Sequence, residues 1–170
     1  MISLSPTLTL GLLRRSGGGE NPYLIHQELG LLMTKAATVV RDNASLVDAL
    51  DQVRVLEKRA ANCSLSDTGA WTNQNVVFTK ALLDMFPLAK AILLGAIARD
   101  ECRGAHFKPD FAMPGLQSTE PAELRREAER WCDQFEANTA KWLKSTIARV
   151  KPDGEVAIEY EDVDTTIIPP

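Results

Sequence analysis

The stretch DNASLVDALDQVRVLEKRA, residues 42–60, carries the clearest structural pattern in the chain. Apolar residues recur in it at steps of three and four, and most of the charged residues lie off that stripe. This period is typical of an amphipathic helix that buries one face. Asp42 and Asn43 are side chains suited to the helix start. The apolar face of such a helix must be buried against other elements, so further helices are expected on either side of it.

Two more helices are predicted around this segment. Asn21 and Pro22 form a strong start signal, an N-cap followed by proline in the first turn, for a helix that ends near residues 36–37. A longer helix is expected from about residue 72 towards Arg99, and Pro87 should bend or divide it. Its second half is almost entirely apolar. Together the three segments predict a mainly α fold built on a three-helix antiparallel, spectrin-repeat-like bundle.

The last third of the sequence changes character. Glu120 and Pro121 indicate an extra helix through about Phe135, followed by two β-prone runs, 142–150 and 156–160. Asp153-Gly154 between these runs predicts a C-terminal β-hairpin. The expected organisation is an irregular N-terminal segment and glycine-rich linker at 1–20, a bundle at 21–111, and the extra helix with the hairpin at 112–170. The three tryptophans, 71, 131 and 142, are expected to anchor the core.

Composition excludes several classes of function. The chain has 170 residues, a net charge of −4 and a pI near 5.2, so it lacks the basic field of a nucleic-acid-binding protein. Its three cysteines are far apart, and no histidine stands at metal-ligand spacing, so no metal site and a cytoplasmic setting are expected. Residues 1–13 do not have the order of a signal peptide. We also expect no stretch of the roughly 18–20 apolar residues that span a bilayer, and hence no direct membrane insertion.

The densest group of chemically active side chains lies at 99–106, RDECRGAH. Cys102 as a nucleophile with His106 as its base would make a thiol enzyme. The alternative is a turn that caps the long helix and ties its end to neighbouring backbone or to another domain. The second interpretation is favoured, because the sequence offers no third orienting group and no oxyanion loop.

Several of these motifs occur together in one known family. Asn21-Pro22-Tyr23, Thr38-Val39-Val40-Arg41 and the segment from Glu101 to Phe111 resemble the C-terminal helical domain of succinate dehydrogenase and fumarate reductase flavoprotein subunits. The family typically has Glu-Ser-Arg-Gly-Ala-His in the last segment, where this chain has Cys102 in place of serine. L-aspartate oxidases share a related domain and are the alternative, and a stand-alone helical adaptor is another.

The resemblance implies a parent enzyme that holds FAD, oxidises succinate to fumarate and passes electrons to an iron–sulfur subunit at the inner face of the membrane. The glycine-rich dinucleotide motif of such enzymes does not occur in this sequence, so no catalytic, flavin-binding or metal-binding residue is assigned to this chain. The missing flavin-binding domain and the iron–sulfur subunit are the expected partners, and the chain is expected to be a fragment. The expected interface or structural motif comprises Glu101, Arg103, Gly104, His106 and Asp110.

Overall fold

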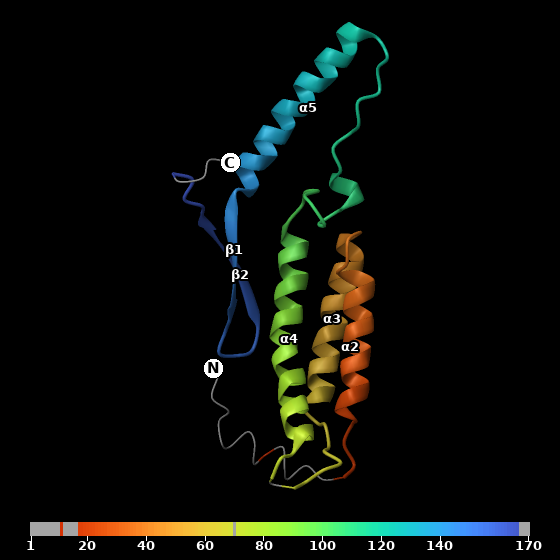
Figure 1. The fold of residues 1–170 in the computed structure, drawn as a ribbon, viewed down its shortest axis with the longest axis vertical. Helices are drawn as coiled ribbons and strands as arrows, with labels where there is room; N and C mark the ends of the chain where they lie inside the picture. Colours follow the sequence, from red (N-terminus) through yellow and green to blue (C-terminus); the bar gives the residue numbers. More distant parts are fainter. Residues whose placement is uncertain (1–10, 12–16, 70, 167–170) are drawn as a thin grey trace.

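The computed structural model describes residue 11 and residues 17–69 and 71–166. Most of the segment expected to be irregular, 1–20, lies outside the described residues. The described part contains four long helices, a short 3-10 helix and a two-stranded antiparallel sheet (Figure 1). Their bounds are α2 Pro22–Ala36, α3 Asn43–Ala60, α4 Gln74–Ala98, η1 Pro109–Phe111, α5 Pro121–Trp142, β1 Lys144–Val150 and β2 Val156–Asp162. The mainly α class with a C-terminal hairpin is confirmed.

Helices α2, α3 and α4 lie side by side as the antiparallel bundle that the sequence predicts (Figure 1). Each begins at a side-chain cap: the side-chain oxygens of Asn21, Asp42 and Asn73 accept hydrogen bonds from backbone amides in the first turn of the helix that follows. The core is one apolar cluster drawn from the three facing stripes, including Ile25, Leu29, Leu46, Val53, Leu82, Phe86 and Leu93. This burial is the main driving force for the bundle.

The sequence predicts a bend or a division of α4 at Pro87, and no stretch apolar and long enough to span a membrane. Pro87 does not divide it, and the helix runs unbroken for 25 residues. The packing of both halves on α3 and α2 outweighs the single backbone hydrogen bond that proline removes. Helix α4 is also long and apolar enough to cross a membrane by length and composition, contrary to the expectation from the sequence. A third of its most apolar window is buried inside the protein, and the core helix of a soluble protein meets the same criterion, so the finding does not establish a membrane span.

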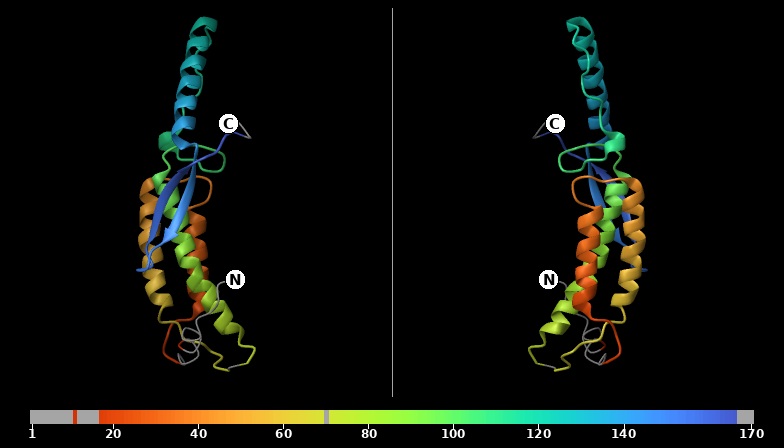
Figure 2. Two further views of the ribbon diagram at one scale, coloured as in Figure 1. Left: turned by 90° about the vertical axis from the view of Figure 1, so that its left-hand side faces the viewer. Right: turned by 90° about the vertical axis from the view of Figure 1, so that its right-hand side faces the viewer.

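The β-hairpin lies against α4 (Figure 2). Its register pairs Lys144 with Asp162 and Val150 with Val156, and Gly154 in the connecting loop has a positive φ of 82°. Lys90, only 1% exposed, holds the loop in place. Its Nζ donates to the Gly154 carbonyl at 2.7 Å and to the Glu57 carboxylate at 2.9 Å, so one ammonium group joins α3, α4 and the hairpin.

Helix α5 projects away from the bundle (Figure 1) and has no buried residue. It extends to Trp142, seven residues beyond the predicted end at Phe135. The expectation that the three tryptophans anchor the core is wrong. Trp71 is 87% exposed, and Trp131 stacks on Phe135 at the surface of α5.

Candidate functional site

The segment predicted as an interface motif forms a tight turn directly after α4. The backbones of Arg103 and His106 exchange two hydrogen bonds, of 2.8 and 3.0 Å. Gly104 lies between them with φ +56°, in the left-handed region that glycine occupies without a steric penalty. The glycine therefore allows the chain to reverse here, and the two flanking side chains diverge, Arg103 towards α5 and His106 towards the connection between α2 and α3.

Glu101 is the buried acid of the turn, at 3% exposure. Its carboxylate accepts from Arg99 at 2.5 Å and from the Arg103 Nε at 3.1 Å. Arg103 in turn donates to the Thr139 hydroxyl at 3.2 Å, and its guanidinium lies over the ring of Phe135. The two arginines balance the buried charge of Glu101, and through Arg103 the turn is bonded to α5.

His106 links the turn to the connection between α2 and α3. Its Nε2 lies 2.8 Å from the Arg99 carbonyl, and its Nδ1 lies 2.9 Å from the Arg41 guanidinium. A carbonyl can only accept a hydrogen bond and a guanidinium can only donate one. These partners therefore require that Nε2 is protonated and Nδ1 is unprotonated. Burial lowers the pKa of His106, and the positive charges of Arg41, Lys108 and Arg99 lower it further, against an opposing effect of the backbone bond. The imidazole is therefore neutral.

Two further contacts fasten the same end of the bundle. Lys108, 1% exposed, donates to the Ile97 carbonyl at 3.0 Å and to Asp100 at 2.9 Å, which satisfies a carbonyl at the end of α4. The Lys108 ammonium lowers the pKa of the Asp100 carboxyl. The Arg41 amide donates to the Phe107 carbonyl, which joins the α2–α3 connection to the segment after the turn.

The structure brings together four of the five predicted motif residues. Glu101, Arg103, Gly104 and His106 form one connected group, whereas Asp110 lies exposed on η1 and makes no hydrogen bond or ion pair within the described part of the chain. Arg41 also belongs to the group, although the sequence prediction did not include it. Its position in the Thr38–Arg41 motif of the resembled family was the one signal that could have pointed to it.

The contacts of this site do not support a thiol enzyme. The Cys102 thiol donates to the Lys108 carbonyl at 3.0 Å, and both ring nitrogens of His106 are bonded to other groups. A general base must lie within hydrogen-bond reach of the proton it removes. The described residues also contain no group of three or more His, Cys, Asp or Glu side chains that could hold a metal ion.

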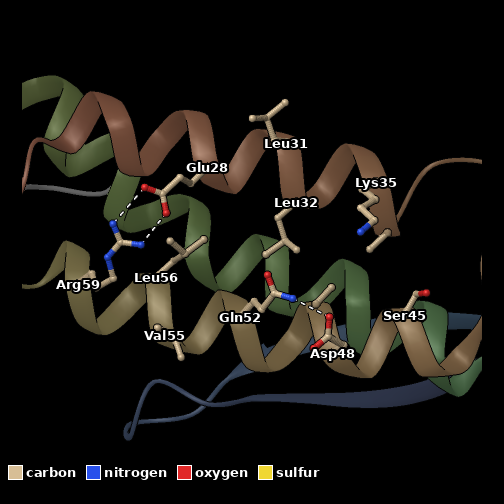
Figure 3. Close-up of a pocket in the computed structure, with 12 residues that line it drawn as sticks. Glu28, Leu31, Leu32, Lys35, Ser45, Asp48, Gln52, Val55, Leu56 and Arg59 are labelled. Atoms are coloured by element: carbon tan, nitrogen blue, oxygen red, sulfur yellow. Dashed lines mark hydrogen bonds and ion pairs between the residues drawn. The ribbon is translucent and has the colours of Figure 1, made fainter.

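Away from the turn, a surface hollow lies in the groove between α2 and α3 (Figure 3). Arg59 crosses this groove and donates to both carboxylate oxygens of Glu28, at 2.6 and 3.1 Å, and also binds Glu20. These ion pairs lower the pKa of Glu28 and of Glu20 through their hydrogen bonds to Arg59. The charged groups at this end are already paired. The rest of the groove mixes apolar side chains such as Leu31 and Leu32 with polar ones, among them the hydrogen-bonded pair of Gln52 and Asp48 (Figure 3).

The described residues do not fit a flavin dinucleotide. Such a site uses glycines at a strand–helix turn so that a phosphate can approach the backbone. Here the two strands belong to a hairpin, and no helix follows them within the described residues. Among the described glycines, only Gly19 lies so close to other backbone that a Cβ atom would not fit. The backbone that approaches it is residues 62–64 of the same chain, so the close approach is already filled. No chemical step is assigned to a flavin on these residues.

Comparison with known proteins identifies the family. The family sequence model described as "Fumarate reductase flavoprotein C-term" matches residues 26–170. The chain belongs to this family. The succinate dehydrogenase flavoprotein subunit of Bacillus subtilis is 38% identical over 154 residues, which cover 90% of this chain and 22% of that subunit. The fumarate reductase flavoprotein subunit of Escherichia coli is 28% identical over 153 residues, again 90% of this chain and 22% of the subunit.

Family membership is supported by solved structures as well. The flavoprotein of E. coli quinol fumarate reductase superposes with a TM-score of 0.73 at 26% identity, over 96% of this chain and 24% of that one. The chain thus spans about a fifth to a quarter of the length of the relatives that it matches. The matched part is the C-terminal domain of a succinate dehydrogenase or fumarate reductase flavoprotein subunit, as the sequence motifs predicted.

Proposed function

We propose that this domain supports and docks onto the flavin-binding portion of a succinate dehydrogenase or fumarate reductase flavoprotein subunit. The parent enzyme would interconvert succinate and fumarate on FAD and exchange electrons with an iron–sulfur subunit at the cytoplasmic face of the membrane. The observation that carries this proposal is the match of the family's C-terminal segment to residues 26–170. The domain itself takes no part in the chemistry, since Cys102 and His106, the candidate nucleophile and base of its most polar site, are bonded to other groups.

The role of the turn follows from its contacts. Glu101, Arg103 and His106 hold the end of α4, the α2–α3 connection and α5 in one arrangement. A rigid arrangement of this kind keeps a docking surface in the shape that its partner recognises, and lowers the entropy lost on binding. We therefore propose that the motif acts on the interface mainly by fixing the shape of this end of the domain.

The proposal is tested on the purified chain. It should contain no flavin and show no succinate–dye reductase activity, and it should bind the FAD-loaded flavin-binding portion of the B. subtilis relative in a pull-down. Stoichiometric flavin in the isolated chain, or an equally strong pull-down by an unrelated flavoprotein, would contradict it.

A further inference from the structure

An apolar strip of α4 is uncovered, and the exposed Asp84, paired with Lys80, borders it on one side. The side chains of Val77, Ala81, Met85, Leu88 and Ile92 are exposed, and their spacing of four, four, three and four places them in one line along the helix. We call these five residues the outer face of α4. Large contiguous apolar surfaces on soluble proteins commonly mark interaction sites.

A positively charged hollow adjoins the outer face at the C-terminal end of α4. It has a volume of about 460 Å³ and is bounded by Ile92 and Gly95 of α4, by Thr146 of β1, and by the side chains of Arg41, Arg99, Arg103 and His106. Three guanidinium groups meet there, and among the described residues Glu101 is the one carboxylate bonded to them. His106 is neutral and adds no charge of either sign.

Arg41 is the unbalanced charge of the hollow. Its hydrogen bonds go to the carbonyls of Thr38 and Ala37 and to the neutral ring of His106. In the described part of the chain it has no carboxylate partner, and it retains two N–H groups beyond the three that these bonds use. A chain with a net charge of −4 therefore presents a local excess of positive charge beside an apolar strip.

We propose that the outer face of α4 and the adjoining arginine hollow together form the surface that docks onto the flavin-binding portion of the flavoprotein subunit. The partner surface is an apolar ridge that ends in a carboxylate, and this carboxylate enters the hollow beside Arg41. Charge complementarity favours an acid at this end, because a charge-assisted hydrogen bond to carboxylate is a strong interaction for the N–H groups that Arg41 retains. This inference rests on the proposed function.

The position of the outer face agrees with this occupant. In the relatives, about three quarters of the chain lies outside the matched segment, so a large body is covalently attached to the domain at high effective concentration. Helix α2 opens the bundle, and Tyr23 in its first turn stacks on Phe78 with ring centroids 4.1 Å apart. Phe78 follows Val77 in α4, so the start of α2 and the beginning of the outer face lie at the same end of the bundle.

The test uses a chimera in which this chain replaces the matched segment of the B. subtilis flavoprotein subunit. Leu88→Cys on the outer face is compared with Leu31→Cys on α2, a leucine of nearly equal exposure, 61% against 65%. Both are made in a background with Cys102→Ser and Cys132→Ser. Maleimide labelling at each position is followed by mass spectrometry, in the chimera and in the isolated chain.

We expect both positions to label at similar rates in the isolated chain. In the chimera, labelling at position 88 should slow about tenfold or more, because a covered thiol reacts only while the interface is briefly open. Labelling at position 31 should not change. A chimera that holds FAD and oxidises succinate while position 88 stays freely reactive overturns this inference and leaves the proposed function standing. A chimera without flavin or activity overturns the proposed function as well.

Two other occupants give different results. A second copy of the chain would protect position 88 in the isolated chain, increasingly at higher concentration, and a membrane would protect it when anionic phospholipid vesicles are added. Either result overturns the inference.

The substitution Arg41→Gln tests the charged end of the surface. The internal hydrogen bonds of Arg41 are lost in both proteins, so the melting temperature should fall in both, and it should fall further in the chimera, where the docking contact is lost as well. Equal falls contradict the role of Arg41 in docking.

Discussion

Replacement of the buried carboxylate by its neutral isostere, Glu101→Gln, should destabilise the domain strongly. Glu101 is 3% exposed and bonds to Arg99 and Arg103. Breaking a fully buried ion pair costs about 3–5 kcal/mol. Here the two arginine side chains are 27% and 39% exposed and can turn towards water, so we expect a smaller loss of about 2–3 kcal/mol. With a urea dependence of about 2 kcal/mol/M, in the middle of the usual range, the unfolding midpoint should fall by about 1–1.5 M.

The measurement is urea unfolding followed by circular dichroism at neutral pH. Glu123→Gln is the matched control: this carboxylate also bonds to an arginine, Arg126 at 2.6 Å, but both side chains are more than half exposed. Its removal should change the unfolding free energy by about 0.5 kcal/mol or less. Equal effects of the two substitutions would refute the idea that Glu101 is the buried centre of the turn.

Three further predictions concern single positions. Lys90→Met removes the ammonium that joins α3, α4 and the hairpin, and should cost about 1–3 kcal/mol and speed amide exchange in β2; unchanged exchange would contradict this role. Gly104→Ala, at φ +56°, should cost about 1 kcal/mol in urea unfolding, whereas Gly30→Ala on exposed α2 should add about 0.5–1 kcal/mol. Because the folded pKa of His106 is lowered, the unfolded chain binds more protons as the pH falls below about 6.5, so stability should decline from there towards pH 5. The variant H106Q should lose this slope and the exposed control H26Q should keep it, when unfolding midpoints are compared across that range.

Local signals explain why the bundle could be predicted from the sequence. The side chains of Asn21, Asp42 and Asn73 each accept a hydrogen bond from a backbone amide of the first turn, as is typical of N-cap residues. The stripe of α3 specifies its buried face without knowledge of the neighbours. Helix α4 gives no such guidance, because it is apolar on nearly all sides. The sequence therefore could not separate the face of α4 that packs in the core from the outer face that the fold leaves uncovered.

The errors arise where tertiary contacts decide the local structure. Trp142 has a high strand propensity, but it ends α5, where its ring lies under the Arg99 guanidinium and edge-on to Tyr160. The bond between Arg41 and His106 joins residues 65 positions apart, and beyond the place of Arg41 in the Thr38–Arg41 motif no pattern in the sequence indicates it. The motif at 101–106 was therefore recognisable, whereas its partners were not.

The activity of the chimera tests the central claim most directly. The B. subtilis flavoprotein subunit should lose bound FAD and succinate–dye reductase activity when the segment matched by this chain is deleted. Insertion of this chain in its place should restore both, since the domain supplies support and a docking surface and no reacting group. Full activity in the deleted subunit would contradict the account, as would a correctly folded chimera that holds no FAD.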